Sequence, residues 1–195
     1  KGSVNASTTK YELDHIPNYE GFGTSNSVGL GLSYPILKTR SHTQMATLSY
    51  AHKTNEDSSG AIGSVTEAEK SIDSITLSFS DKRNTNIANH PGKLYASISV
   101  TGGDVSMDNS VAKTNDASIK TEGSYSKANI SLTHTQQFSP VLSLQTDFKA
   151  QKSFGKNLDS SEDISVGGSN GVRAYEDSEL SGDQGMLASL NLIYA

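Results

Sequence analysis

Few side chains in this sequence of 195 residues have the types and spacings that carry catalysis or hold metals. There is no cysteine, and no two of the five histidines stand two or four residues apart, as metal ligands on one strand or helix would. These histidines are His15, His42, His52, His90 and His134. The many serines occur in polar runs, and no Ser-His-Asp set stands out among them. We therefore expect no catalytic residue, no metal and no cofactor.

Two acidic runs suggest a different chemistry, the binding of calcium by carboxylates. They are "NEDSS" at residues 55–59 and "DSSEDIS" at residues 159–165. Loose calcium binding at a cell surface is one interpretation. The simpler one, which we favour, is that these carboxylates lie in loops and are solvated.

A third candidate is a single cation in a long glycine-rich segment. Residues 164–185 read "ISVGGSNGVRAYEDSELSGDQG", and Arg173 is the one arginine or lysine among them. In an arbitrary loop such a guanidinium is a solvated surface charge. The alternative is a group that holds the loop in place, because a planar guanidinium can pair with a carboxylate through two hydrogen bonds.

The composition narrows the class of protein. Apolar residues make up 33% of the chain, against roughly 45–50%, glycine included, in an average globular protein. The net charge is -5 and no lysine or arginine cluster occurs, so we expect no binding of nucleic acid. No apolar run is long enough for a membrane-spanning helix. Because both ends of the sequence read as strand, we expect the chain to be part of a longer protein.

The apolar residues follow a period of two, which predicts β-strands and argues against helix throughout. In residues 28–34, apolar side chains alternate with glycines and a serine. The apolar positions there are Val28, Leu30, Leu32 and Tyr34. We expect about eight strands, at residues 2–13, 25–36, 43–55, 70–83, 92–104, 122–138, 140–154 and 185–195.

The connections between these strands differ in length in a regular way. Shorter connections with proline follow the second and sixth strands, and residues 82–92 are an intermediate exception. Long polar connections are expected near residues 14–25, 56–70, 105–121 and 155–184. Long loops at one rim, short turns at the other and strands with one apolar face are typical of outer-membrane β-barrels. A soluble β-sandwich or β-solenoid gives similar alternation, so periodicity alone leaves those folds open.

The segment around Arg173 resembles the sixth extracellular loop, and the strand after it, of two-partner-secretion outer-membrane transporters, the haemolysin secretion/activation family. The match comprises a glycine pair, a Val-Arg-Ala-Tyr tetrad and a Ser-Gly-Asp-x-Gly turn. Its residues are Gly167, Gly168, Gly171, Val172, Arg173, Ala174, Tyr175, Ser181, Gly182, Asp183 and Gly185. Residues 29–57 are similar to a strand pair of the same family.

The resemblance implies an all-β fold, an antiparallel transmembrane β-barrel. The chain would supply about eight strands, from about the fifth to the twelfth, of a larger barrel of about sixteen. Residues 1–195 would thus form one partial barrel domain, without the family's periplasmic domains and last four strands. The implied location is the bacterial outer membrane, with a monomeric barrel in contact with outer-membrane lipid.

In the resembled family this loop folds back into the lumen, where its arginine contacts an acidic residue of the inner wall. The resemblance therefore implies a loop lock at residues 172–175, with the glycines allowing sharp backbone turns. We expect the acidic partner of Arg173 in strands outside this chain, although Asp147 and Asp183 are candidates within it. The acid that the family often carries in the next strand is replaced by Asn191.

The implied function is a pore, without catalysis, that translocates a large secreted exoprotein of the adhesin or haemolysin type. Polar residues of the seventh strand would line its lumen, namely Gln145, Asp147, Lys149 and Gln151. Two other functions stay open here: a porin-like or adhesive outer-membrane barrel, and a soluble β-rich adhesin fragment. Several tyrosines either form girdles at the membrane interfaces or are simply good strand formers, namely Tyr11, Tyr34, Tyr50, Tyr95 and Tyr194.

Overall fold

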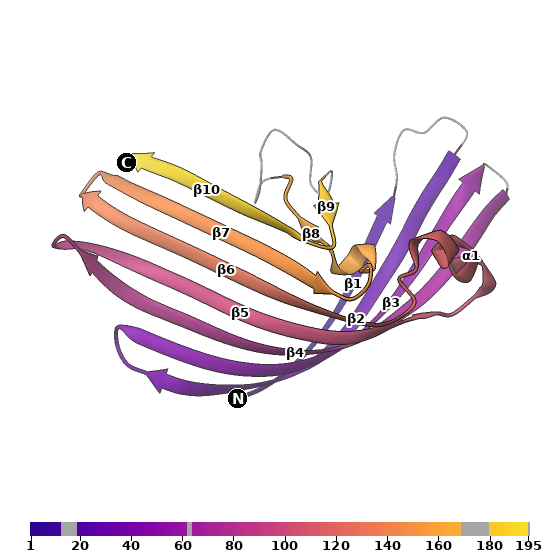
Figure 1. Cartoon of the computed structure of the whole chain (residues 1–195), viewed down its shortest axis with the longest axis horizontal. Coiled ribbons are helices and arrows are strands. Elements are labelled where there is room, and N and C mark those ends of the chain that lie inside the picture. Colours follow the sequence, from indigo (N-terminus) through magenta and orange to yellow (C-terminus); the bar gives the residue numbers. More distant parts are fainter. Residues whose placement is uncertain (13–18, 62–63, 169–179, 195) are drawn as a thin grey trace.

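The structure, a computed structural model, describes residues 1–12, 19–61, 64–168 and 180–194. Eight long strands form one antiparallel sheet in the order β1-β2-β3-β4-β5-β6-β7-β10 (Figure 1). Their bounds are β1 Gly2–Glu12, β2 Tyr19–Lys38, β3 His42–Ala61, β4 Ser64–Ile87, β5 His90–Met107, β6 Gly123–Ser139, β7 Leu142–Phe154 and β10 Gly185–Tyr194. The predicted antiparallel all-β fold, consistent with a partial β-barrel, is confirmed.

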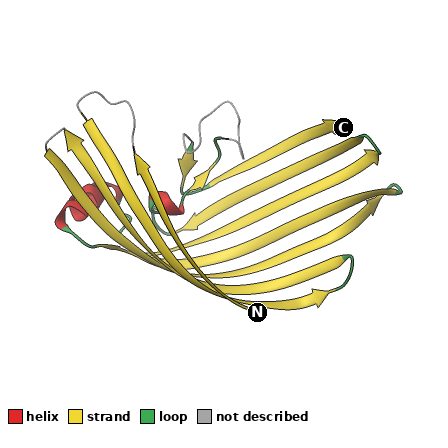
Figure 2. Cartoon of the chain, turned by 180° about the vertical axis from the view of Figure 1, so that it is seen from behind, coloured by secondary structure: helices red, strands yellow, loops and turns green. Residues whose placement is uncertain are grey.

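The sheet is strongly curled, and smaller elements lie on its concave side (Figures 1 and 2). They are the helix α1 Ser110–Ile119, the short 3-10 helix η1 Ser160–Glu162 and a two-residue pair of strands, β8 Ile164–Ser165 and β9 Ser181–Gly182. We call the side of the sheet that they cover the inner face, and the opposite side the outer face. None of the helices in the described ranges is long and apolar enough to cross a membrane.

The outer face is apolar and open to its surroundings. Leu30 of β2, Leu77 of β4 and Leu190 of β10 are exposed by 52, 60 and 71%. The register places such side chains next to one another across the strands, since Leu48 is opposite both Leu32 and Leu77. A sheet face with this much exposed apolar surface suits an apolar solvent rather than water.

Polar clusters bound the apolar face at both ends. On β4 it lies between Asp73 and Asp81, a distance of about 26 Å at roughly 3.3 Å per residue. Asp73 accepts hydrogen bonds from Tyr50 and pairs with His52, at 2.5 and 2.9 Å. With the strand tilt of about 35–45° usual in outer-membrane barrels, this length corresponds to a band about 20 Å tall, of the same order as their apolar belt of roughly 25 Å.

The inner face carries short polar side chains that bond across the strands. Hydroxyls pair at 2.8 Å between Thr76 and Thr101. Asn129 donates to Gln151 at 2.6 Å, and Thr133 to Asp147 at 2.8 Å. The low apolar content of the sequence therefore has a structural cause, because only one face of each strand is apolar.

Two of the predicted long loops are wrong in their bounds. The loop expected near residues 14–25 is strand from Tyr19 onward, and the loop expected near 56–70 is strand up to Ala61 and again from Ser64. The ladder continues there with polar pairs such as Glu56 opposite Glu69. Beyond the apolar belt both faces are polar, so the alternation used to find strands disappears while the backbone pairing goes on.

The connection at residues 82–92 is also tighter than predicted. β4 runs to Ile87 and β5 begins at His90, which leaves a two-residue turn. Ala88 and Asn89 both have positive φ, 52° and 63°, as the type I′ hairpin turn requires. The three turns at this rim are therefore all short, as the barrel pattern requires.

The expected loop at residues 105–121 contains a helix, contrary to the prediction of no helix. Asn109 caps it by accepting a hydrogen bond from the amide of Ala112 at 2.9 Å. Lys120 ends it in the left-handed conformation. The buried carboxylate of Asp116 then accepts hydrogen bonds from the Thr121 amide and hydroxyl at 2.7 and 2.5 Å. These local caps explain a helix in a segment without strand alternation.

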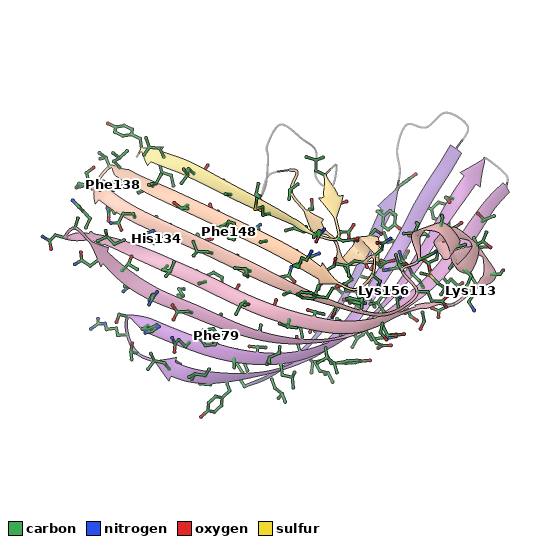
Figure 3. The ribbon with its side chains drawn as sticks, in the orientation of Figure 1. Phe79, Lys113, His134, Phe138, Phe148 and Lys156 are labelled. Atoms are coloured by element: carbon green, nitrogen blue, oxygen red, sulfur yellow. The ribbon has the colours of Figure 1, made fainter. Side chains whose placement is uncertain are left out.

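The compact hydrophobic core lies under these smaller elements rather than along the sheet. It joins inner-face residues of β4, β5 and β6 to α1 and to the chain after β7. Its members are Ile72, Val105, Met107, Ala112, Tyr125 and Leu158. Figure 3 shows Lys113 and Lys156 at this end of the sheet, and Phe138 and His134 toward the end with the short turns.

Candidate functional site

The central motif from the sequence lies mostly outside the described residues. Residues 169–179, which include Gly171 and the tetrad Val172, Arg173, Ala174 and Tyr175, belong to the part that is not described. Gly167 and Gly168 precede it and are buried. Gly168 has a φ of 81°, a conformation that favours glycine.

The two limbs of this connection run side by side. Ile164 lies opposite Gly182 in the β8–β9 pair, and Ser165 lies opposite Ser181. The amide of Val166 also donates to the carbonyl of Leu180 at 2.9 Å. The position of one limb therefore fixes the position of the other.

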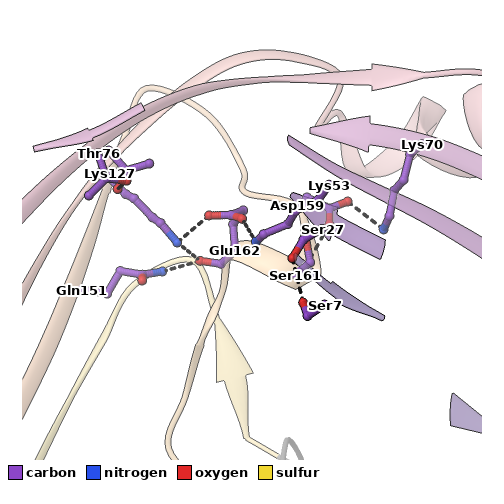
Figure 4. Close-up of polar contacts among 11 residues, drawn as sticks. Ser7, Ser27, Lys53, Lys70, Thr76, Lys127, Gln151, Asp159, Ser161 and Glu162 are labelled. Carbon is purple, nitrogen blue, oxygen red and sulfur yellow. Dashed lines mark hydrogen bonds and ion pairs between the residues drawn. The ribbon is translucent and has the colours of Figure 1, made fainter. Parts of the chain in front are cut away.

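The first limb is tied to the inner face by Glu162 (Figure 4). Its carboxylate pairs with Lys53 of β3 through one oxygen, and with Lys127 of β6 through the other at 2.9 Å. Lys127 also donates to the backbone carbonyl of Glu162 at 2.6 Å. One side chain thus links two strands that are separated in the sheet by β4 and β5.

Asp159 forms a second tie one turn earlier. Its carboxylate lies 2.9 Å from the ammonium of Lys70 on β4, and it accepts from the amide and hydroxyl of Ser161 at 3.0 and 2.8 Å. We refer to five residues together as the wall anchor: Lys53, Lys70, Lys127, Asp159 and Glu162.

The second limb is tied through the end of β7. The side-chain amide of Gln151 donates to the backbone carbonyls of Glu162 and Asp183, at 3.0 and 3.1 Å. The carboxylate of Asp183 accepts from the amide of Leu158 at 2.9 Å. Both limbs are therefore bonded to the same patch of the inner face.

The anchor carboxylates are buried and remain charged. Asp159 is 4% exposed and Glu162 is 6% exposed. Burial by itself raises the pKa of each carboxyl, but the paired lysines and hydrogen bonds outweigh it, so both pKa values lie below the usual range. Such pairs fix position, because removing one partner would leave the other charge buried alone.

Asp163 behaves in the opposite way. Burial and the nearby charge of Asp183 raise the pKa of Asp163 to about 6. One oxygen of this carboxyl is buried without a hydrogen-bond partner among the described residues. Next to the wall anchor, Asp163 is therefore a carboxyl whose charged form is disfavoured by burial and by Asp183.

The four residues expected to line the lumen lie on β7 at inner-face positions. Asp147 accepts from Gln145 at 2.8 Å as well as from Thr133. Lys149 stands opposite Ser131 and Leu187. Gln151 is buried beneath the folded connection, so it supports the connection rather than facing open space.

The interpretation of "DSSEDIS" as solvated loop acids is wrong for Asp159 and Glu162. The sequence did not reveal their burial, because the lysines that pair with them lie far away in the chain. A signal existed, because the residues directly opposite Lys53, Lys70 and Lys127 in the neighbouring strands are all uncharged. These neighbours are Ser27, Ile72, Asn55, Met107, Thr101 and Ser153. Lysines on an inner face without a carboxylate directly opposite suggest partners in a loop, although Lys70 also lies 3.8 Å from Asp57 of β3.

The histidines are spread over the sheet, and His15 lies outside the described residues. His42 pairs with Asp81 on the outer face at 2.5 Å. Among the residues that the structure describes, no group of three or more histidine, aspartate and glutamate side chains could hold a metal ion. Tyr34, Tyr50 and Tyr194 share the outer face, whereas Tyr11 and Tyr95 occupy inner-face positions.

The arrangement is therefore a sheet with an apolar outer face, a polar inner face and a long connection tied into its hollow. A family model described as haemolysin secretion/activation protein ShlB/FhaC/HecB matches residues 2–195. The chain belongs to the haemolysin secretion/activation family. This family consists of outer-membrane transporters, not enzymes, and its members act with a secreted exoprotein partner in two-partner secretion. Searches of curated proteins and of solved structures gave no match.

Proposed function

We propose that the chain forms part of the wall of an outer-membrane pore through which a large exoprotein, of the adhesin or haemolysin type, leaves the cell. The observation that carries the proposal is the contrast between the two faces, in a chain that belongs to the haemolysin secretion/activation family throughout its length. The apolar outer face would contact membrane lipid, and the barrel would act as a monomer. The exoprotein would pass along the polar inner face.

The inner face suits a passing polypeptide for a physical reason. Its side chains are mostly hydroxyls and amides, which bond to one another and can exchange such bonds with a moving backbone. Gln145, Asp147 and Lys149 add charged and polar groups on β7. A surface of this kind stays wet and offers no large apolar patch to which a chain in transit would adhere.

Arg173 and Tyr175 are the residues of the connection that we propose to brace it in the pore, with Val172 and Ala174 completing the motif. A guanidinium suits this role because it remains charged and can pair with a carboxylate in two places. Asp147 and Asp183, whose backbone carbonyl accepts from Gln151, lie on the same side of the sheet as the connection.

Secretion by the full-length protein tests this proposal. Cells with Arg173→Ala should release much less of the exoprotein, while the amount of folded barrel in the outer membrane stays unchanged. Lys120→Ala, at the exposed end of α1, is the matched loss of a cation and should secrete normally. Normal secretion by Arg173→Ala would refute the role of the motif. A folded protein that conducts ions but releases no partner in any form would favour a porin-like channel instead.

A further inference from the structure

We propose that Glu162 is a positioning residue that holds residues 155–166 against the inner face as a fixed part of the channel wall. The inference rests on the proposed function only for its effect on secretion, since the packing itself can be measured without an exoprotein.

Three features distinguish this contact from an ordinary surface ion pair. Glu162 is only 6% exposed, its carboxylate contacts lysines from two strands that are not neighbours, and its backbone carbonyl accepts a hydrogen bond as well. Exposed pairs are worth roughly 0–1 kcal/mol, whereas removing one partner of a buried pair is far more disruptive. Glu162 is therefore the contact on which the position of the limb depends most.

The neighbouring contacts place the rest of the connection relative to Glu162. Asp159 and Lys70 tie the chain three residues earlier, and Leu158 fills the core under α1. Gln151 binds the carbonyls of Glu162 and Asp183 together, so the returning limb is held at the same place. The motif residues between the two limbs thus start and end at a site fixed by Glu162.

The consequence for the pore is that this segment occupies the hollow of the sheet in the resting state and during passage. If the segment swung away, it would lose the contacts of Glu162 and Asp159 with the lysines, and Leu158 would leave the core that it shares with Val105. The inner wall available to a passing chain is then the part that residues 155–166 and α1 leave uncovered.

A cysteine reporter can test this in the full-length protein freed of any other cysteine, since residues 1–195 contribute none. Val105→Cys is the reporter, since Val105 is 1% exposed and lies in the core beneath the segment. A membrane-impermeant maleimide should label it slowly in the parent. Adding Glu162→Gln should speed labelling by roughly tenfold or more, because the buried pairs are lost. It should also raise the single-channel conductance of the protein in a planar bilayer.

The matched control is Glu122→Gln, the same loss of charge at an exposed residue just before β6. It should change neither labelling nor conductance. If Glu162→Gln does not reach the membrane, Lys127→Gln removes the same pair from the strand side and carries the same expectation. Equal labelling in parent and variants overturns the inference, whatever happens to secretion. Faster labelling with normal secretion supports the anchor and shows that transport does not depend on it, whereas loss of secretion in Glu122→Gln as well would point away from Glu162.

Discussion

The carboxylate of Glu162 lies 2.9 Å from the ammonium of Lys127, although 35 residues separate them in the chain. Lys127 points inward from β6, and Glu162 belongs to the connection between β7 and the edge strand β10. The pair shows that this connection is part of the inner wall. It also explains how the polar residues 159–163 are held in place, since buried charges fix them beside the core residue Leu158.

The charge of Asp163 gives the anchor a pH dependence. Because its pKa in the folded protein is raised to about 6, the folded state holds the proton more tightly than the unfolded state. The stabilisation is complete below the unfolded pKa of about 3.9 and falls as the pH rises to about 6. The labelling rate of Val105→Cys, divided at each pH by the rate for the unfolded protein so that the ionisation of the thiol itself cancels, should therefore rise between about pH 4 and pH 6.

Asp163→Asn should remove this dependence, so that the normalised labelling rate stays low throughout that range. Asp159 and Glu162 have the opposite effect, because their pKa values are lowered in the folded protein. The stability that their charged forms contribute is present at neutral pH and is lost only as the pH falls through those lowered pKa values. A pH dependence that is the same in Asp163→Asn would assign the titration to another group.

Gly103 has a packing role that Gly102 lacks. A Cβ at Gly103 would lie 2.6 Å from a ring carbon of Tyr125 and 2.7 Å from the carbonyl of Asp73, whereas at Gly102 it would meet nothing within 4 Å. Gly103→Ala should cost about 1–3 kcal/mol through the forced shift. The temperature at which the folded barrel loses its compact electrophoretic mobility should fall for Gly103→Ala and stay unchanged for Gly102→Ala. Equal values would mean that Tyr125 moves away without cost.

The outer face should reject charge where the inner face accepts it. Leu77→Lys places an ammonium in the middle of the apolar band, which costs roughly 2–4 kcal/mol at the midplane of a bilayer. Ser78→Lys places the same side chain on the inner face. The amount of folded protein in outer-membrane fractions should fall for Leu77→Lys alone. A similar loss for both variants would contradict the assignment of the faces.

The sequence predicted most of the sheet because lipid and water impose opposite demands on alternate residues. Val28, Leu30 and Leu32 lie on one face as expected, and the eight strands follow in the expected order. The strand ends were misplaced where that contrast stops, as in residues 56–61, because both faces there are polar.

The candidate site was predictable only in part. Alternation placed the β7 residues on the inner face as observed, whereas the role of the motif glycines and of Asp183 stays a prediction. Glu162 and Asp159 were missed because their burial depends on Lys53, Lys70 and Lys127, which lie 35 to 109 residues away in the chain. Helix α1 was missed for a different reason, since its caps at Asn109 and Lys120 are local signals that strand periodicity does not detect.

The most direct test of the account is a cross-link between the full-length protein and an exoprotein arrested in passage by a folded domain at its end. Ser131 and Ile130 are neighbours on β6 that face inward and outward, with Ile130 46% exposed on the outer face. A cysteine at Ser131 should cross-link to the arrested chain, and a cysteine at Ile130 should not. Cross-linking from Ile130 alone, or from neither position while secretion proceeds in the parent, would contradict passage along the inner face.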